Sequence, residues 1–319
     1  MTNSLLRWLI FALLGVLATP SPTRAQSAPP PPEAAWQLPL AHPTLNGSVQ
    51  ASSATDGAGN VYVCGSFDGT VSFGPHKLSS TVRKGKYGLF WNDGFVAKRS
   101  AAGQWEWATR LGARGNRFRV AITQVVATPR GEVVVAGTYG DTLTFAGTTT
   151  TVYAPGGYGM FVAHLSAAGA WGQVTAATAA YFAYPTSTEP EEDPPLVKCT
   201  SMVLDARGTV YLAGVHKIGF QLGSLTLPAP AIARAEDGFV VALGANGSWQ
   251  WVQKLPGANE AVRLAVAPNE GVVVAGQYYG STLQLGRFTV VNLKPINYSF
   301  SSERNLTDVF IARLSPTGQ

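Results

Sequence analysis

Two sequence patterns recur four times along this chain, and their recurrence constrains the fold more than any other feature. The first pattern is a turn followed by an apolar run, and its copies are DGAGNVYVCGSF from Asp56, TPRGEVVVAGTY from Thr128, DARGTVYLAGVH from Asp205 and APNEGVVVAGQY from Ala267. The second is an apolar run followed by a turn, and its copies are DGFVAKRSAAGQW from Asp93, GMFVAHLSAAGAW from Gly159, DGFVVALGANGSW from Asp237 and DVFIARLSPTGQ from Asp308. Equivalent glycines of the first pattern are 72, 77 and 62 residues apart, at Gly65, Gly137, Gly214 and Gly276. Such self-similarity is typical of a chain built from modules that stack on one another.

Each copy carries four short strand signals. In the second copy these are AITQVVA, EVVVAGTY, MFVAHL and WGQVT, with RG, a variable stretch and SAAGA between them. Runs of β-branched, apolar and aromatic residues bounded by Gly, Pro, Asp and Ser indicate strands, and no segment after residue 25 has sustained helical periodicity. The irregular spacing argues against a β-solenoid, and modules of about 70 residues are small for independent sandwiches. We therefore predict an all-β fold, a β-propeller of four blades with four antiparallel strands each.

The first copy also carries a resemblance to a known family. DGAGNVYVCGSF followed by DGFVAKRSAAGQWEWATRLG resembles the β-propeller repeats of secreted bacterial proteins called SBBP-type repeats. These read D-x-x-G-N-x-Y-V-x-G, then D-x-F-V-A-K-L-x-x-x-G, then an aromatic strand. The resemblance covers nearly all of the chain from Trp36, although Thr128 replaces the first Asp in copy two and Ala242 replaces the Lys in copy three. It implies a propeller in an exported bacterial protein and implies no shared reaction.

The N-terminal segment has the pattern of a secretory signal peptide. Arg7 precedes an apolar stretch of about 11 residues, and Thr23-Arg24-Ala25 ends in a small residue suited to cleavage. This stretch is shorter than the roughly 20 residues that a membrane-spanning helix needs. We therefore predict that the chain has no transmembrane segment. We also predict that the protein is exported and is either secreted or held at the cell surface, with the periplasm as a further possible location. The expected domains are a signal peptide (1–25), a proline-rich spacer (26–35) and a propeller (36–319) with approximate repeats 36–104, 105–170, 171–248 and 249–319.

The two ends of the propeller region are expected to complete one blade between them. The region begins with AWQLPL, which fits an outermost strand, and ends with FIARLSPTGQ, which fits a third strand without an outermost strand after it. We expect Trp36–Leu40 to pair with Val309–Leu314 and close the ring, with Trp36 in the place of the tryptophan that follows each earlier third strand. Closure removes a sheet edge that would invite aggregation. The competing interpretation is a fragment of a longer repeat array.

Charge and cysteine content narrow the possible partners. Cleavage removes Arg7 and Arg24, so Lys plus Arg falls from 23 to 21 against 18 Asp plus Glu, and the net charge falls from +5 to +3. This charge is too small to indicate a nucleic-acid partner. Cys64 and Cys199 are too few for a disulfide framework, and Cys64 replaces an alanine of the other copies, which predicts a small buried side chain. We expect no cofactor and a monomer.

Two predictions concern the turns and loops of each copy. Asp56 and Asp205 begin hairpin turns, so each carboxylate is expected to bond its own turn rather than a metal ion. The pieces VSFG, LTFAG, FQLG and LQLG, which start at Val71, Leu143, Phe220 and Leu283, are expected to be short extra strands. They lie inside the long variable stretches that separate the second and third strands.

Candidate binding residues lie in these long connections and in those that follow the fourth strands, which propeller topology places on one face. The connections are 68–92, 111–119, 140–159, 176–195 and 278–307, and loops on a rigid scaffold commonly carry binding sites. The candidates are Trp91, Tyr158, Tyr181, Tyr184, Tyr279, Arg114 and Arg117. Aromatic rings among small polar residues suit a glycan or a protein surface, although the same rings would also pack the loops onto the blades.

The sequence favours binding over catalysis. It has no H-E-x-x-H, no G-x-S-x-G, no P-loop and no dinucleotide-binding glycine motif between a strand and a helix. A binding or interaction module is therefore the first prediction. Two alternatives stay open, a carbohydrate-active hydrolase or lyase with its site at the central channel, and a non-catalytic spacer or adhesin fragment.

Overall fold

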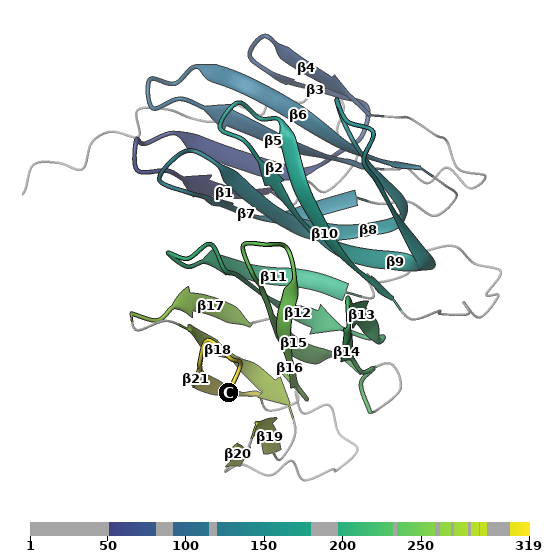
Figure 1. Cartoon of the computed structure of the whole chain (residues 1–319), viewed down its shortest axis with the longest axis vertical. Helices are drawn as coiled ribbons and strands as arrows, with labels where there is room; N and C mark the ends of the chain where they lie inside the picture. Colours follow the sequence, from purple (N-terminus) through teal and green to yellow (C-terminus); the bar gives the residue numbers. More distant parts are fainter. Residues whose placement is uncertain are drawn as a thin grey trace, which may run out of the picture. The chain divides into compact units, whose positions relative to one another are not determined.

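The described part of the protein consists of antiparallel β-strands. The structure is a computed structural model that describes residues 51–80, 92–114, 120–179, 197–231, 235–258, 262–268, 271–279, 282–286, 288–291 and 307–319. Every regular element among these residues is a strand, and every pair of strands runs antiparallel (Figure 1). No helix that could cross a membrane occurs in these ranges. The predicted all-β class is confirmed.

Three sets of four strands share one pairing order, in which the first strand pairs with the second, the second with the third and the third with the fourth. We call each set a quartet. Quartet 1 is β1 (Ala51–Thr55), β2 (Val61–Phe67), β5 (Asp93–Arg99) and β6 (Trp105–Arg114). Quartet 2 is β7 (Val120–Ala127), β8 (Val133–Phe145), β9 (Thr151–Leu165) and β10 (Trp171–Ala179). Quartet 3 is β11 (Val197–Leu204), β12 (Val210–His216), β15 (Asp237–Leu243) and β16 (Trp249–Leu255).

A further sheet has three strands in the same order. These are β17 (Arg263–Val266), β18 (Val272–Tyr279) and β21 (Thr307–Leu314), and we call them the trio. The described residues include no strand on the outer side of β21. Trp36–Leu40, the segment expected there, lies outside the described residues, so ring closure stays a prediction.

The aligned glycines have the same register in the three quartets and in the trio. Gly65, Gly137, Gly214 and Gly276 are each paired with the first phenylalanine of the third strand. A Cβ atom at Gly137 would overlap the carbonyl oxygen of Ala121, and one at Gly214 would overlap that of Lys198. In quartets 2 and 3 the first strand therefore approaches the second too closely for any side chain, which explains the glycine there.

An aromatic pair accompanies each of these glycines. The side chain two residues after the glycine meets the phenylalanine edge to face, with ring centroids 6.1, 6.2, 5.9 and 6.5 Å apart for Phe67–Phe95, Tyr139–Phe161, His216–Phe239 and Tyr278–Phe310. All eight rings are buried. Edge-to-face pairs of this kind add to the stabilisation that burial provides.

Consecutive sets of strands pack through apolar cores, and the pairing of β6 with β8 also joins quartets 1 and 2 edge to edge in one ten-stranded sheet. One core joins quartets 1 and 2, a second joins quartets 2 and 3, and a third joins quartet 3 and the trio. Hydrogen bonds also link the first strands: Thr123 Oγ1 donates to the Cys199 carbonyl at 3.0 Å, and Thr200 Oγ1 donates to the Val262 carbonyl at 2.9 Å. Each threonine lies at a β-bulge, which turns its hydroxyl toward the next sheet.

The short extra strands are confirmed. They form the hairpins β3 (Thr70–Phe73) with β4 (His76–Ser79), β13 (Phe220–Leu222) with β14 (Leu225–Leu227), and β19 (Thr282–Leu285) with β20 (Phe288–Val291). In quartet 2 the piece LTFAG instead extends β8. Phe73 meets Trp105 at 5.0 Å and Phe145 meets Trp171 at 5.2 Å between ring centroids. The added strands therefore cover the first tryptophan of the fourth strand.

The trio exposes a face that the quartets bury. Ile311 is 76% exposed and Val309 is 69% exposed, whereas the residues equivalent to Ile311 in the quartets, which are Val96, Val162 and Val240, are fully buried. In each quartet this valine belongs to an apolar core that is shared with the following set of strands. The described residues provide no such cover for the trio.

Candidate functional site

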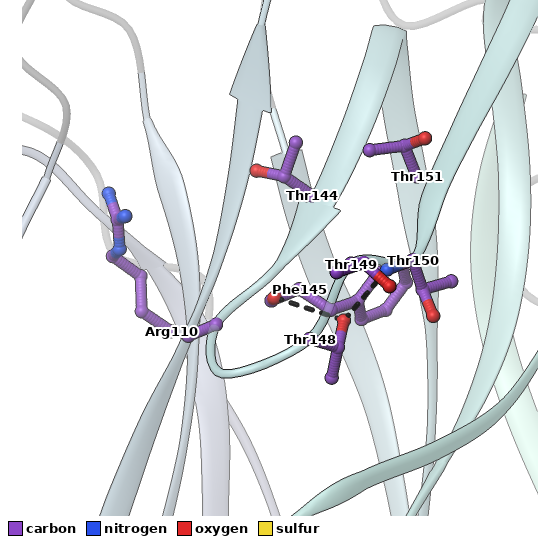
Figure 2. A pocket seen from close by; sticks show the side chains of 8 residues that line it. Arg110, Thr144, Phe145, Thr148, Thr149, Thr150 and Thr151 are labelled. Atoms are coloured by element: carbon purple, nitrogen blue, oxygen red, sulfur yellow. Dashed lines mark hydrogen bonds between the residues drawn. The ribbon is translucent and has the colours of Figure 1, made fainter.

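A hollow of about 320 Å³ lies beside the β8–β9 hairpin. Figure 2 shows Arg110 on one strand at one side of the hollow and a group of threonines on the hairpin at the other side. The lining residues are Arg110, Thr144, Phe145, Ala146, Thr148, Thr149, Thr150 and Thr151. Hydroxyl groups and one guanidinium group therefore dominate the polar lining.

The strand register explains why these polar groups share one face. The end of β6 pairs with the far half of β8, which places Gly112 opposite Thr144, and Thr144 is in turn opposite Thr151 on β9. Side chains alternate between the two faces of a strand. Leu143 and Phe145, the neighbours of Thr144 on β8, point into the core between quartets 1 and 2. The side chains of Thr144 and Thr151 are therefore directed toward the opposite, outer face.

An exposed aromatic ring continues this outer face. Tyr153 lies two residues beyond Thr151 on β9, on the same side of the strand, and is 60% exposed. Its partner across the hairpin is Thr142. The outer face of the hairpin therefore presents hydroxyl groups beside a tyrosine ring.

A buried carboxylate holds the arginine. Arg110 Nη1 lies 2.7 Å from Asp93 Oδ2, and the Asp93 side chain is 5% exposed while that of Arg110 is 29% exposed. Quartet 3 has the equivalent pair, Lys254 Nζ and Asp237 Oδ2 at 2.9 Å. Quartet 2 lacks both partners, since Gly159 and Ala176 take their places. The Asp93 charge balances that of Arg110, so the side chain offers directed N–H donors without a large net positive field.

Hydrogen bonds to β6 and within the hairpin orient two of the hydroxyl groups. Thr144 Oγ1 donates to the Gly112 carbonyl at 3.2 Å, and Thr148 Oγ1 donates to the Phe145 carbonyl at 3.2 Å. The Thr150 N–H donates to Thr148 Oγ1 at 3.1 Å, and Figure 2 marks the two bonds of Thr148. The Thr144 hydroxyl donates its proton internally and still has lone pairs to accept a bond from a ligand.

Most of the site residues predicted from the sequence are not described by the structure. Trp91, Tyr181, Tyr184 and Arg117 lie outside the described residues. Tyr279 ends β18 and Arg114 ends β6, and only their backbones are described. Tyr158 lies in β9 and packs against the core between quartets 2 and 3. Of the predicted site residues, therefore, only the side chain of Tyr158 is placed, and it contributes to packing.

Two stretches predicted as loops are strands. The connection 140–159 continues β8 to Phe145 and resumes as β9 at Thr151, and Leu111–Arg114 belongs to β6. The reason is that β6 of quartet 1 pairs with the far half of β8 in quartet 2, which provides partners for the backbone of both. The threonine run TTTT was the available signal for the hollow, and sequence reasoning missed it.

The predicted turn role of the aspartates is confirmed. Asp56 Oδ1 accepts bonds from the Ala58 and Asn60 N–H groups, each at 2.9 Å, and Asp56 Oδ2 accepts one from Tyr62 Oη at 2.9 Å. Asp205 accepts the equivalent N–H bonds at 2.9 and 2.8 Å. Burial raises the pKa of Asp56, but the hydrogen bonds from Asn60, Tyr62 and Ala58 outweigh it and hold that pKa below its usual value.

The cysteines and histidines form no reactive group within the described ranges. Cys64 and Cys199 are free and buried, and burial raises the pKa of each thiol to about 12. This confirms Cys64 as a small buried side chain. No group of three or more His, Cys, Asp or Glu residues in these ranges is arranged to hold a metal ion.

Comparison with known proteins assigns no family. No protein-family model matches the chain, and no curated protein matches its sequence. The resemblance to SBBP-type repeats therefore rests on the motif residues alone and stays a prediction.

Proposed function

We propose that this chain is an exported binding module that recognises a glycan at the hollow beside the β8–β9 hairpin. The observation that carries the proposal is the combination of threonine hydroxyls, a positioned guanidinium and an exposed tyrosine ring on one face. Sugars present hydroxyl groups that both donate and accept hydrogen bonds, and apolar C–H faces that pack on aromatic rings. The threonines and Arg110 match the hydroxyl groups, and Tyr153 matches the C–H face.

The charge of the site also favours a neutral or weakly acidic sugar. Arg110 is paired with Asp93 at 2.7 Å, so a strongly anionic ligand would have to compete with a buried carboxylate. The volume of about 320 Å³ is at the small end of the range of ligand sites, about 300–1,000 Å³. A short segment of a glycan fits this description better than a folded partner does.

The scaffold proposed for this function is a closed β-propeller of four blades, as in the SBBP-type repeats that the motifs resemble. The shared strand order of the quartets and the cores between consecutive sheets support blades that stack face to face. The exposed face of Val309 and Ile311 supports closure, since the equivalent faces are all covered. In this proposal Trp36–Leu40 provides the outermost strand beside β21.

A glycan array with the mature chain tests the proposal. Tyr153→Ala should weaken binding to any selected glycan at least tenfold, because the ring supplies its apolar contact. The matched control is Phe288→Ala, which removes a ring of similar exposure, 62%, from the β19–β20 hairpin and should leave the affinity unchanged. Binding to no glycan, or equal loss in both variants, would contradict the proposal.

The same glycans distinguish binding from catalysis. Incubating each bound glycan with the protein and measuring new reducing ends tests for a hydrolase, and measuring absorbance of unsaturated products tests for a lyase. A binding module leaves the glycan intact. Turnover would instead support the carbohydrate-active enzyme.

A further inference from the structure

Two polar side chains of the hollow converge beside a single glycine. A Cβ atom on Gly112 of β6 would lie 3.1 Å from Thr144 Oγ1 and 3.7 Å from Arg110 Nη1. Both of these side chains line the hollow, and in Figure 2 the hydroxyl oxygen of Thr144 is on the side that faces Arg110. The φ angle of Gly112 is not in the left-handed region, so its backbone does not require a glycine. The missing Cβ atom leaves open a space over Gly112, which we call the gap.

The hydrogen-bonding roles on the two sides of the gap complement each other. Arg110 Nη1 donates to Asp93 Oδ2 at 2.7 Å, which uses one of the five N–H donors of the guanidinium group and holds that group in place. Thr144 Oγ1 donates its proton to the Gly112 carbonyl at 3.2 Å, so toward a ligand it acts as an acceptor. The gap therefore has donors on one side and an acceptor on the other.

The junction between quartets 2 and 3 has the same strand pairing but different side chains. Counted from the first tryptophan of each fourth strand, Thr178 has the place of Gly112, and it is paired with Gln221 of β13. Ala176 has the place of Arg110. This junction therefore has a side chain where the gap would be, and it lacks the guanidinium group.

The fourth strand of quartet 3 has a cation but not the gap. Lys254 has the place of Arg110, and its Nζ atom lies 2.9 Å from the aspartate of the quartet and donates to the Ala229 carbonyl at 2.9 Å. Pro256 has the place of Gly112. An ammonium group has three donors against the five of a guanidinium group, so fewer are left for a ligand. Among the described sets of strands, only the junction of quartets 1 and 2 combines the gap with a guanidinium group.

Two adjacent hydroxyl groups of a sugar fit this arrangement. A sugar hydroxyl both donates and accepts hydrogen bonds, so one member of the pair can accept from Arg110 while its neighbour donates to Thr144. A carboxylate or phosphate group offers only acceptors, so it could bind Arg110 but could not donate to the Thr144 oxygen. The polar groups beside the gap therefore favour a neutral diol over an anion.

We propose that the hollow recognises a vicinal diol of a neutral sugar, which lies over the backbone of Gly112 between Arg110 and Thr144. Gly112 admits the sugar, Arg110 donates to one hydroxyl and Thr144 accepts from the other. Asp93 is a positioning residue, because it holds Arg110 and does not touch the sugar. This inference names the ligand class of the proposed glycan site and rests on that proposal.

Deoxy sugars test the proposal with the mature chain. The probes are methyl β-D-glucoside, methyl β-D-galactoside and methyl α-D-mannoside, each with its 2-, 3- and 4-deoxy derivatives. Together these sugars present adjacent hydroxyls in the equatorial–equatorial and axial–equatorial arrangements. NMR titration should show that at least one parent sugar binds, and that removing either of two adjacent hydroxyls weakens its binding at least tenfold, because a polar group of the site is then left unpaired.

Variants of Thr144 assign one of these hydroxyls. Thr144→Val should no longer distinguish the parent sugar from the deoxy derivative that lacks the hydroxyl donated to Thr144, whereas Thr144→Ser keeps the acceptor and should keep the discrimination. The matched control is Thr226→Val, which removes an exposed hydroxyl that donates to Gln221 Oε1 at 3.1 Å on the β13–β14 hairpin. This control should leave both the affinity and the discrimination unchanged.

A variant of Gly112 tests the gap itself. Gly112→Ala should weaken binding of the parent sugar at least tenfold, because the new methyl group occupies the space between Arg110 and Thr144. The control Gly57→Ala adds a methyl group at an exposed position where a Cβ atom has no atom within 4 Å, and it should leave the affinity unchanged.

The possible outcomes separate this inference from the proposed function. Equal discrimination by the unmodified chain and by Thr144→Val overturns the inference, as does sensitivity to one hydroxyl only or to two that are not adjacent. A chain that binds a glycan on the array but none of these sugars also overturns it, while glycan recognition stands. A chain that binds no glycan at all contradicts the proposed function itself.

Discussion

Replacing Gly169 with alanine should destabilise the protein far more than the same change at Gly147. Both glycines have a left-handed backbone, with φ +79° and +75°, but a Cβ atom on Gly147 would have no atom within 4 Å. Gly147→Ala therefore carries only the cost of a left-handed alanine, about 1 kcal/mol. Gly169→Ala also displaces the Trp107 ring, whose Cδ2 atom would lie 2.6 Å from the new Cβ.

The additional cost follows from the contacts that Trp107 makes. Its indole N–H bond to Ala167, 3.0 Å long, contributes about 1 kcal/mol. Its ring lies 6.1 Å from that of Tyr62, and such a pair contributes about 1 kcal/mol. Gly169→Ala should therefore lower the free energy of unfolding by about 3 kcal/mol, against about 1 kcal/mol for Gly147→Ala.

Urea unfolding followed by circular dichroism measures both values. In a Trp107→Ala background, Gly169→Ala should cost only about 1 kcal/mol, which gives a coupling energy of about 2 kcal/mol between the two positions. The reasoning is refuted if the two glycine variants have equal stability, or if removing Trp107 leaves the cost of Gly169→Ala unchanged.

Three further changes test other parts of the structure. Asp237→Ala leaves Lys254 without its carboxylate and should lower the free energy of unfolding in urea by about 2 kcal/mol. Glu236, which pairs with Lys217, is more exposed, so Glu236→Ala should lower it by less than about 1 kcal/mol. Equal losses in the two variants would argue against a stabilising role of the buried pair. Burial lowers the pKa of His216 despite its backbone bond to Ile218, so the unfolded chain binds the proton more readily and stability falls as the pH drops below about 6.5. His216→Phe should flatten this decline between about pH 7 and pH 5, and an unchanged slope would assign it to other groups. Ile311→Asp should cost about 3 kcal/mol if closure covers the trio, and an unchanged unfolding midpoint would show that this face stays in water.

Local signals were sufficient to predict the strands. The run AITQVVA became β7, Val120–Ala127, and MFVAHL ends β9 at Leu165, because β-branched and apolar residues suit a buried pleated surface whichever sheet they join. The short strands such as β13, Phe220–Leu222, were predicted for the same reason. The all-β class therefore followed from the sequence.

The candidate site could not be predicted in the same way. The stretch 140–159 was expected to be a variable connection between the second and third strands, with one short strand at Leu143, yet pairing with β6 extends both β8 and β9 through it. That pairing joins residues about 30 positions apart, such as Gly112 and Thr144, and no local pattern specifies it. The hollow depends on this pairing, so the residues around it were not recognised as a site.

The sequence by itself determined where most strands form and which glycines and phenylalanines hold equivalent places in the four copies. These features are local or periodic, so neighbouring residues along the chain are enough to reveal them. Only the tertiary structure decided that the Trp107 indole docks on the turn between β9 and β10 of quartet 2. The Trp107 contact is formed with a carbonyl 60 residues away, so it exists only once quartets 1 and 2 have packed together.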